Sequence, residues 1–360
     1  MQLSQLTPAI KRCLELNIPM AVFAYPGEDD YIFLSSMPHP TTGENELTTF
    51  DGSRAYFEID FFNHDNSYPV GVTDMLSPGD IAAIPASFKP LPGADIFPQS
   101  KSTPYIIYAA QLHEIVKRLP RSGAKTVLSR VIAGQSGTTD IAAICEEYFA
   151  AYPDTCRYIF FTQETGLWIG ATPELLLDYD YATGTFTTVS LAGTRPVCDG
   201  PWDDKNIGEH DIVTSFINAC LNDAGATDIH ISPLHNKRFG QIEHLCTEFT
   251  GKYGGDPRDL IYRLSPTPAV AGYPRDKALL HILTYETHNR HCYAGHIVTV
   301  DPAARRLRAF VNLRCAFLAT THGKTLYNIY AGGGLVKKST APDEWDETQA
   351  KSSLLQSLLK

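Results

Sequence analysis

The C-terminal 68 residues carry the side chains best suited to chemistry. They supply a phenol at Tyr293, a cation at Arg314 and a glycine run at Gly332, Gly333 and Gly334. A planar guanidinium matches a carboxylate with two parallel hydrogen bonds. Glycines let backbone N–H groups approach an anion closely. We therefore expect a site for a small molecule that carries carboxylate groups.

The segment after this glycine run adds acidic and basic groups. Glu344, Glu347 and Lys351 are spaced i, i+3 and i+7, so they fall on one face of a helix. Mg²⁺ prefers one or two carboxylates together with water and substrate oxygens. The segment therefore predicts a hard divalent cation beside a substrate with several carboxylates.

A further carboxylate, Glu209, is expected to turn inward on a separate helix at about 206–222. It lies four, seven and eleven residues before Val213, Phe216 and Cys220, and so shares the apolar face. A carboxylate directed at a core is costly unless it meets a cation or hydrogen bonds. A structural ion pair explains one such glutamate. Two inward-facing carboxylate helices in one chain favour a Mg²⁺ site over that alternative.

The strands that must position these groups occur in clusters between helices and do not alternate with the helices one by one. Runs of β-branched and aromatic residues cluster between helical segments, which favours an α+β fold with a large, mostly antiparallel sheet system. Helices are expected at 105–119, 139–151, about 206–222 and 275–284, and from about 344. Strands are expected at 20–25, 31–34, 55–62, 158–162, 167–169, 175–179, 186–191, 229–231, 246–252, 295–300, 307–313 and 325–331.

Composition narrows the class of protein. The 360 residues include 40 acids and 30 bases, a formal charge of −10 that argues against a nucleic-acid partner. We find no membrane-spanning apolar run and no secretory signal. Eight cysteines without a CxxC pair are typical of reduced thiols in a cytoplasmic protein. A zinc site formed by His244, Cys246, His291 and Cys292 is an alternative, although its ligand spacing is unconvincing.

Ten short motifs, in order, resemble those of the chorismate-utilising enzymes. They begin at Lys125 and end at Lys351, and read KTVLSR, ATPELL, LAGTR, GEH, HL, PTPAV, YAG, VNLR, AGGG and EWDETQAK. The resemblance implies a single chorismate-binding domain over residues 1–360, built as in anthranilate synthase component I. That fold has two packed, mainly antiparallel sheets with outer helices. Residues 1–120 would be its variable part and 121–360 its motif-bearing catalytic part.

Within this family the chain is most similar to isochorismate synthases. Lys125 stands where isochorismate and salicylate synthases have a lysine base and anthranilate synthases usually have a glutamine. Ala192 stands where many aminodeoxychorismate synthases have a nucleophilic lysine. The segment around Thr267 is similar to the isochorismate synthase form. The resemblance implies Mg²⁺-dependent conversion of chorismate to isochorismate, for menaquinone or siderophore biosynthesis. Salicylate synthase, anthranilate synthase component I and a non-catalytic chorismate-binding protein are the alternatives.

The resemblance also assigns the chemistry. Lys125 would be the base that activates water at C2 of chorismate, and Glu174 the acid that protonates the departing C4 hydroxyl. Each has a structural alternative, because Lys125 could be a surface residue before a strand and Glu174 could pair with Arg195. Glu209 and Glu347, with Glu344 nearby, would hold Mg²⁺. The residues that would contact substrate are Ala192, Gly193, Thr194, His244, Thr267, Tyr293, Arg314, Gly332, Gly333, Gly334 and Lys351.

Several positions depart from the family pattern or stay open. Asn206 stands three positions before Glu209, where relatives commonly have an acid, and this predicts a change in Mg²⁺ affinity. His296 replaces the proline that commonly follows the Tyr-Ala-Gly motif. His210 could support the site from behind or face solvent, and the glycine run could instead be a tight turn or a β-bulge. We expect a monomer or weak homo-oligomer with no membrane partner.

Overall fold

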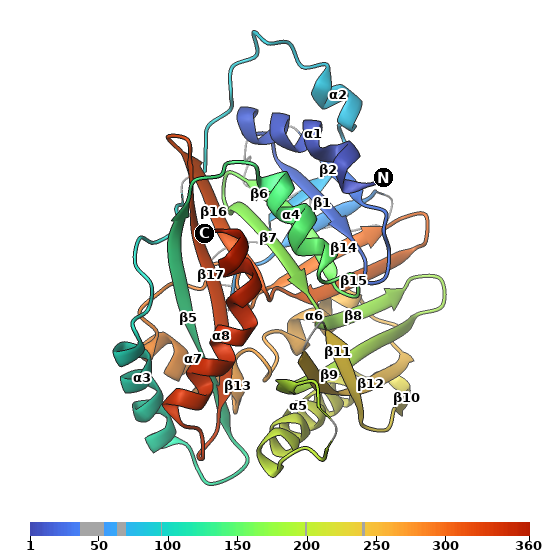
Figure 1. Cartoon of the computed structure of the whole chain (residues 1–360). Helices are drawn as coiled ribbons and strands as arrows, with labels where there is room; N and C mark the ends of the chain where they lie inside the picture. Colours follow the sequence, from blue (N-terminus) through green and yellow to red (C-terminus); the bar gives the residue numbers. More distant parts are fainter. Residues whose placement is uncertain (37–53, 63–69, 95, 199, 240–241) are drawn as a thin grey trace.

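Two large antiparallel sheets lie face to face in the computed structural model, with helices outside them (Figure 1). The structure describes residues 1–36, 54–62, 70–94, 96–198, 200–239 and 242–360. Strands that are far apart in the sequence lie side by side in both sheets, so residues 1–120 and 121–360 form one unit. The predicted fold class is confirmed.

The first sheet has eight strands among the described residues, and Lys125 is the first residue of one of its two longest strands. Its order is β13 (Gly272–Tyr273), β5 (Lys125–Ser136), β17 (Lys324–Leu335), β16 (Cys315–Thr321), β7 (Gly166–Thr172), β6 (Cys156–Thr162), β1 (Met20–Ala24) and β2 (Ile32–Ser35). Strands β5 and β17 pair over their whole length, from Thr126 opposite Leu335 to Ser136 opposite Thr325. This long ladder places the glycine run beside the start of β5.

The second sheet carries the LAGTR and HL motifs on adjacent strands. Its order is β10 (Thr227–Ile231), β12 (Ile242–Lys252), β9 (Thr185–Pro196), β8 (Leu175–Asp180), β15 (Arg306–Val311), β14 (His296–Asp301), β3 (Tyr56–Ile59) and β4 (Val70–Thr73), and β11 (His235–Phe239) pairs with β12. The two sheets bury a common apolar core. In it, the rings of Phe57 from β3 and Phe160 from β6 stack at 5.2 Å between centroids.

Helices close the outer faces. Three of them, α1 (Leu3–Leu16), α4 (Ile141–Ala150) and α8 (Ala341–Leu358), share a second core with the outer face of the first sheet. The short α2 (Pro78–Ala82) lies beside α1, while α3 (Tyr105–Arg118) and α7 (Arg275–Tyr285) pack near β5. On the second sheet, α5 (Asp204–Asp223) packs on β9 and α6 (Pro257–Leu264) on β8. No described helix is long and apolar enough to cross a bilayer.

Sequence patterns missed some elements. Helix α1 was not expected, although Leu3, Leu6, Ile10 and Cys13 recur at helical spacing and are all buried. Strands β4, β5, β11 and β16 and helix α6 were also not expected. Strand β5 ends in half-buried and exposed residues, so its pattern is that of neither a fully buried nor a regularly alternating strand.

Candidate active site

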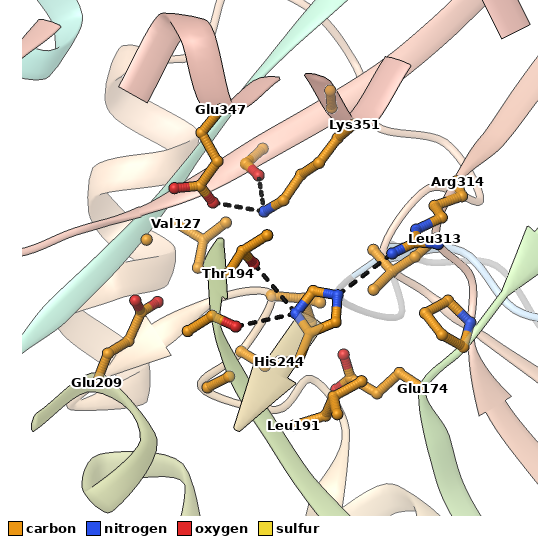
Figure 2. Close-up of a pocket in the computed structure, with 18 of the residues that line it drawn as sticks. Val127, Glu174, Leu191, Thr194, Glu209, His244, Leu313, Arg314, Glu347 and Lys351 are labelled. Carbon is orange, nitrogen blue, oxygen red and sulfur yellow. Dashed lines mark hydrogen bonds and ion pairs between the residues drawn. The ribbon is translucent and has the colours of Figure 1, made fainter. Parts of the chain in front are cut away.

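A pocket opens where the ends of β5 and β17 face β9 and β12. It holds about 790 Å³ of empty space, including its open mouth. In Figure 2, Glu209 and Glu347 lie on the left of this pocket and Arg314 and Glu174 on the right, with His244 between them. Of the residues predicted from sequence, those that line it are Lys125, Glu174, Ala192, Gly193, Thr194, Glu209, His244, Tyr293, Arg314, Gly332, Gly334, Glu347 and Lys351.

Three predicted residues lie just behind the pocket wall. Thr267 is buried and donates a hydrogen bond from Oγ1 to Glu174 Oε1 at 3.3 Å. Gly333 and Glu344 face each other on the α8 side, since a Cβ on Gly333 would lie 2.7 Å from Glu344 Oε2. Thr267 and Gly333 are not among the residues that line this pocket, so their direct contacts with substrate stay predictions.

The structural alternatives for the two catalytic candidates are wrong. The Lys125 side chain is completely buried, which excludes a surface position. Glu174 does not pair with Arg195, whose Nε instead contacts Glu243 Oε1 at 2.7 Å. Burial raises the pKa of Glu174 to about 7, against the opposing effects of Thr267 and of nearby lysines. A carboxyl group with this pKa holds a proton for part of the time at neutral pH, as a general acid must.

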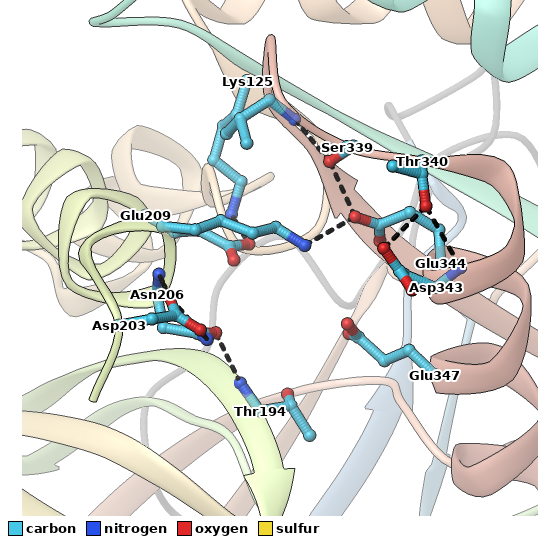
Figure 3. A network of polar contacts seen from close by, with 12 residues as sticks. Lys125, Thr194, Asp203, Asn206, Glu209, Ser339, Thr340, Asp343, Glu344 and Glu347 are labelled. Atoms are coloured by element: carbon cyan, nitrogen blue, oxygen red, sulfur yellow. Dashed lines mark hydrogen bonds and ion pairs between the residues drawn. The ribbon is translucent and has the colours of Figure 1, made fainter. Parts of the chain in front are cut away.

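Each carboxylate predicted to hold a metal is paired with a lysine. Glu209 Oε1 lies 2.6 Å from Lys125 Nζ. Glu344 Oε1 lies 2.7 Å from the ammonium of Lys205, and Glu347 Oε1 lies 2.7 Å from that of Lys351, one helical turn along α8. Figure 3 shows the three carboxylates around a common space. They are not among the described groups whose ligand atoms all lie within 4.8 Å of one another.

The donor set nevertheless fits a dication. Glu344 is fully buried, and its Oε2 has no hydrogen-bond partner in the described part of the chain. Burial, and next the charge of Glu347, raise the pKa of Glu344. Burial alone would also raise the pKa of Glu209, but Lys125 outweighs it and the pKa falls. A cation among these oxygens would satisfy the unpartnered atom and relieve the repulsion between the two acids on α8.

The glycine run lies inside a regular strand, so the alternatives of a turn or bulge are wrong. A Cβ on Gly334 would meet Glu209 Oε1 at 2.0 Å, which makes glycine necessary for this close approach. Opposite the run, Ser129 N–H donates to Glu286 and Val127 N–H to Ala271, both away from β17. By the alternation of an antiparallel ladder, Gly332 and Gly334 also turn their peptide groups away from β5.

His244 sits opposite a β-bulge, where Gly193 and Thr194 of β9 together face one residue of β12. Its Nδ1 lies 2.9 Å from the Gly193 carbonyl oxygen, which can only accept, so Nδ1 carries the proton. Burial, and next Arg314, lower the pKa of His244 to about 3. The ring is therefore neutral, and its Nε2 accepts a hydrogen bond from Arg314 Nη2 at 3.3 Å.

Arg314 and Tyr293 keep donors free at the pocket. Arg314 is left-handed at φ 47°, in the turn from β15 to β16, and its carbonyl oxygen accepts from Tyr148 Oη at 2.7 Å. Its Nη1 is buried with no hydrogen-bond partner among the described residues. Tyr293 is buried, stacks on Tyr330 with ring centroids 5.2 Å apart, and lines the pocket beside Gly332. Both groups suit an incoming carboxylate.

The remaining sequence questions have structural answers. Asn206 accepts from Thr194 N–H at 3.3 Å and donates to both carboxylate oxygens of Asp203, so its amide braces the bulge. His210 is buried against Thr247, which excludes the solvent-facing alternative. His296 is buried, with Nε2 3.7 Å from Asp60 Oδ2.

Sequence reasoning missed the apolar walls of the pocket and one cation. All the wall residues except Tyr330 lie inside the ten motifs, but no site role was assigned to them: Val127, Pro173, Leu191, Ala269, Val270, Leu313, Tyr330 and Ala331. Lys205 was not among the predicted site residues, yet it reaches Glu344 from the first turn of α5. Its place four residues before Glu209, on the same helical face, is the signal that was available.

Comparison with known proteins places this geometry in a family. Residues 96–360 match the family model described as chorismate binding enzyme. The chain belongs to the chorismate binding enzyme family. It is 28% identical to isochorismate synthase EntC of Escherichia coli K12 over 246 residues, which is 64% of this chain. The match spans 61% of the length of that relative.

Solved structures show the same fold. One is MenF, the menaquinone-specific isochorismate synthase from Escherichia coli, with a TM-score of 0.75 and 20% identity over 99% of this chain and 91% of that chain. Another is anthranilate synthase component I from Streptococcus pneumoniae TIGR4, with a TM-score of 0.65 and 14% identity over 96% of this chain and 91% of that chain. At these identities the likeness establishes the fold of two packed sheets.

Proposed function

We propose that this protein is an Mg²⁺-dependent isochorismate synthase that converts chorismate to isochorismate, for menaquinone or siderophore biosynthesis. One observation carries the proposal: Glu174, with its pKa raised to about 7, and the buried Lys125 line a single pocket. An acid and a base facing one substrate are what the exchange of a hydroxyl group requires. The sequence relationship to EntC supports this reaction over others in the family.

Arg314 and Tyr293 bind one carboxylate of chorismate in this proposal. The free Arg314 Nη1 and the Tyr293 hydroxyl supply donors without the loss of an existing hydrogen bond to the described residues. His244 holds the guanidinium from the other side through Nε2. We assign this end to the enolpyruvyl carboxylate, because the opposite end of the pocket holds the acidic groups that suit a metal and the ring carboxylate.

Glu209 and Glu347, supported by Glu344, would hold Mg²⁺ at that opposite end. The ion would supply a positive charge that neutralises the ring carboxylate and orients the ring. Lys351 contacts Glu347 and the carbonyl oxygen of Gly332, and so lies where it can contact the same carboxylate. If Glu209 bound a cation, its carboxylate would no longer need Lys125 as its partner. Once this lysine has given up its proton, its neutral amine nitrogen would be available to the pocket as a base.

The reaction in this proposal is a balanced exchange of water. Lys125 Nζ takes a proton from a water molecule as the water oxygen bonds to C2 of the ring. The two conjugated ring double bonds each shift by one position, the C4–O bond breaks, and Glu174 gives its proton to the departing hydroxyl, which leaves as water. Thr267 holds the Glu174 carboxyl in place from behind. One water enters and one leaves, so the product is an isomer of chorismate.

The test is to incubate the purified protein with chorismate, with and without Mg²⁺, and to separate the products by chromatography. We expect isochorismate that depends on the metal and no pyruvate. Salicylate with pyruvate would replace the proposal by a salicylate synthase, and anthranilate formed with ammonia would replace it by an anthranilate synthase. Saturable chorismate binding without any product would leave a binding protein and remove the catalytic roles.

A further inference from the structure

Three side chains on the second sheet have metal-binding atoms that the proposed reaction does not use. His235, Cys246 and Glu248 each offer one such atom, and these atoms all lie within 4.8 Å of one another. Within the described ranges they are the sole group of at least three His, Cys, Asp or Glu side chains with this property. The zinc site considered from sequence shared Cys246 with them, but its other members are not part of this group.

Strand pairing places the three on one face of the sheet. His235 of β11 lies directly opposite Cys246 of β12 in the antiparallel ladder. Glu248 follows Cys246 by two residues on the same strand, so its side chain leaves on the same face. The ladder is in regular register from His235 to Phe239, and this register fixes the relative positions of the side chains.

The donor atoms are free to bind. His235 Nδ1 lies 3.2 Å from the Pro233 carbonyl oxygen, which can only accept, so Nδ1 is the protonated nitrogen and Nε2 keeps its lone pair. A backbone carbonyl that orients a histidine in this way is usual in metal sites. Neither the thiol of Cys246 nor the carboxylate of Glu248 has a hydrogen bond or ion pair with the described residues.

Exposure gives the cluster an entry path. Cys246 is fully buried and packs with Val189, Leu191 and Phe239, while Glu248 is half-buried and His235 is exposed. An ion could therefore reach the thiol from solvent between the two outer ligands and keep a water molecule as a further ligand.

We propose that His235, Cys246 and Glu248 bind a divalent transition-metal ion of the Zn²⁺ class. Sulfur, imidazole nitrogen and carboxylate oxygen are the three ligand types that Zn²⁺ takes, whereas Mg²⁺ takes oxygen alone. A thiolate and a carboxylate together balance the charge of the ion. The site is separate from the acidic groups around Glu209, and it takes no part in the proposed reaction or in binding its Mg²⁺.

The site would act on the strand that carries His244. That histidine lies two residues before Cys246 on β12, and Leu191, the strand partner of Cys246, lines the pocket. An ion shared by β11 and β12 would tie the edge of the sheet together next to the bulge. Binding at this site therefore stabilises the β11–β12 pairing against thermal unfolding.

The test is a titration of the full-length, chelator-treated protein with Co²⁺, followed by absorption spectroscopy without chorismate. We expect the near-ultraviolet charge-transfer band of a cobalt–thiolate bond, removed by Zn²⁺ and unaffected by excess Mg²⁺. Cys246→Ala abolishes the band. His235→Ala and Glu248→Gln weaken Co²⁺ binding at least about tenfold, as the loss of a ligand does. His235→Ala changes an exposed residue, so its effect does not depend on refolding the core.

Two variants serve as controls. Cys198→Ala removes an exposed thiol and His230→Ala an exposed histidine on β10, and both leave the band unchanged. The proposal is overturned if no band forms at millimolar Co²⁺, if the band survives in Cys246→Ala, or if Cys198→Ala removes it. Because no substrate is present, these outcomes are distinct from success or failure of the isochorismate synthase assay.

Discussion

The two ends of the pocket are built on opposite principles. At one end Glu209, Glu344 and Glu347 each hold a lysine at 2.6–2.7 Å. At the other end Arg314 Nη1 has no partner among the described residues, and the phenol of Tyr293 faces the pocket. To bind a metal ion, a carboxylate at the first end would have to give up its lysine partner. The second is already arranged for its ligand.

This difference indicates that ligand binding requires more reorganisation at the lysine-paired end than at the end that holds Arg314. A group with free, fixed donors gains most of its interaction energy on binding, because little reorganisation precedes it. A carboxylate paired with a buried lysine must first leave that lysine without a partner. The lysine pairs compensate the charge of three neighbouring acids, and they would lower the net affinity for the proposed Mg²⁺. Substitutions at the two ends should therefore affect substrate binding and metal binding differently.

The largest effect is expected between the two ends, at the residues that carry the chemistry. Glu174→Gln keeps the shape of the carboxyl but not its acidic proton, and Lys125→Met keeps most of the stem but not the amine. Each should lower the turnover of chorismate by about 10²- to 10⁴-fold while chorismate still binds. Initial rates and equilibrium binding measure the two quantities. Glu58→Gln, a buried acid on β3 outside the pocket, should keep near-normal turnover.

The second effect tests the preformed end. Arg314→Lys keeps the charge but loses the fork that reaches both His244 and the pocket. Chorismate should bind about 10- to 100-fold more weakly, the loss of a charge-assisted hydrogen bond, while Mg²⁺ binding without substrate stays the same. Calorimetry measures both affinities. Arg308→Lys, whose guanidinium pairs with Asp178, is the control. Equal losses for substrate and metal would contradict the division between the ends.

The third effect tests the lysine-paired end. Lys205→Met removes the cation beside Glu344, so Mg²⁺ no longer competes with it and should bind about fivefold more tightly, which is about 1 kcal/mol. The melting temperature without metal should fall, since Glu344 is left buried and unpaired, and Mg²⁺ should restore it. Lys11→Met, from an exposed pair with Asp140 at the same 2.7 Å, should change neither quantity. Weaker Mg²⁺ binding would show that Lys205 supports the metal rather than opposing it.

The smallest effect concerns pH. Glu174 must be protonated to act, so kcat/KM should fall as the pH rises through about 7. The Thr267 hydroxyl donates to the carboxylate and lowers its pKa, which burial raises. Thr267→Val removes that bond, so the pKa of Glu174 rises and the alkaline limb moves to higher pH. A pH–rate profile measures the shift. A limb that stays in place would assign it to another group.

Local patterns predicted most of the fold, whereas the family resemblance supplied most of the candidate site residues. Strand β6 is visible as a short run of apolar and aromatic residues, and helix α3 because its apolar residues recur at helical spacing. The motif order brought Lys125, Glu174 and Arg314 together correctly, although they come from β5, the turn before β8 and the turn before β16. No periodicity could have placed these three in one pocket, because their meeting depends on the order of the strands in both sheets.

The pairing of charges could not be predicted. Lys125 and Glu209 are 84 residues apart, and Lys205 and Glu344 are 139 apart. A sequence shows that an inward carboxylate needs a cation, but not whether a metal or a lysine supplies it. In the same way, the motif around Thr267 did not show that its hydroxyl donates a hydrogen bond to Glu174. Side-chain packing decides which groups contact one another, and the spacing of motifs does not reveal that packing.

The interleaved strand order has a consequence for the folding of the chain as the ribosome makes it. Strand β3 lies between β4 and β14, and β14 ends at Asp301, more than 240 residues after Ile59. At about 5–20 residues per second, a ribosome needs about 12–50 s to make the intervening chain. During that interval the hydrogen-bonding edge of β3 that faces β14 in the folded protein lacks its partner strand. The nascent N-terminal third must therefore be shielded, or remain unfolded, until translation is nearly complete.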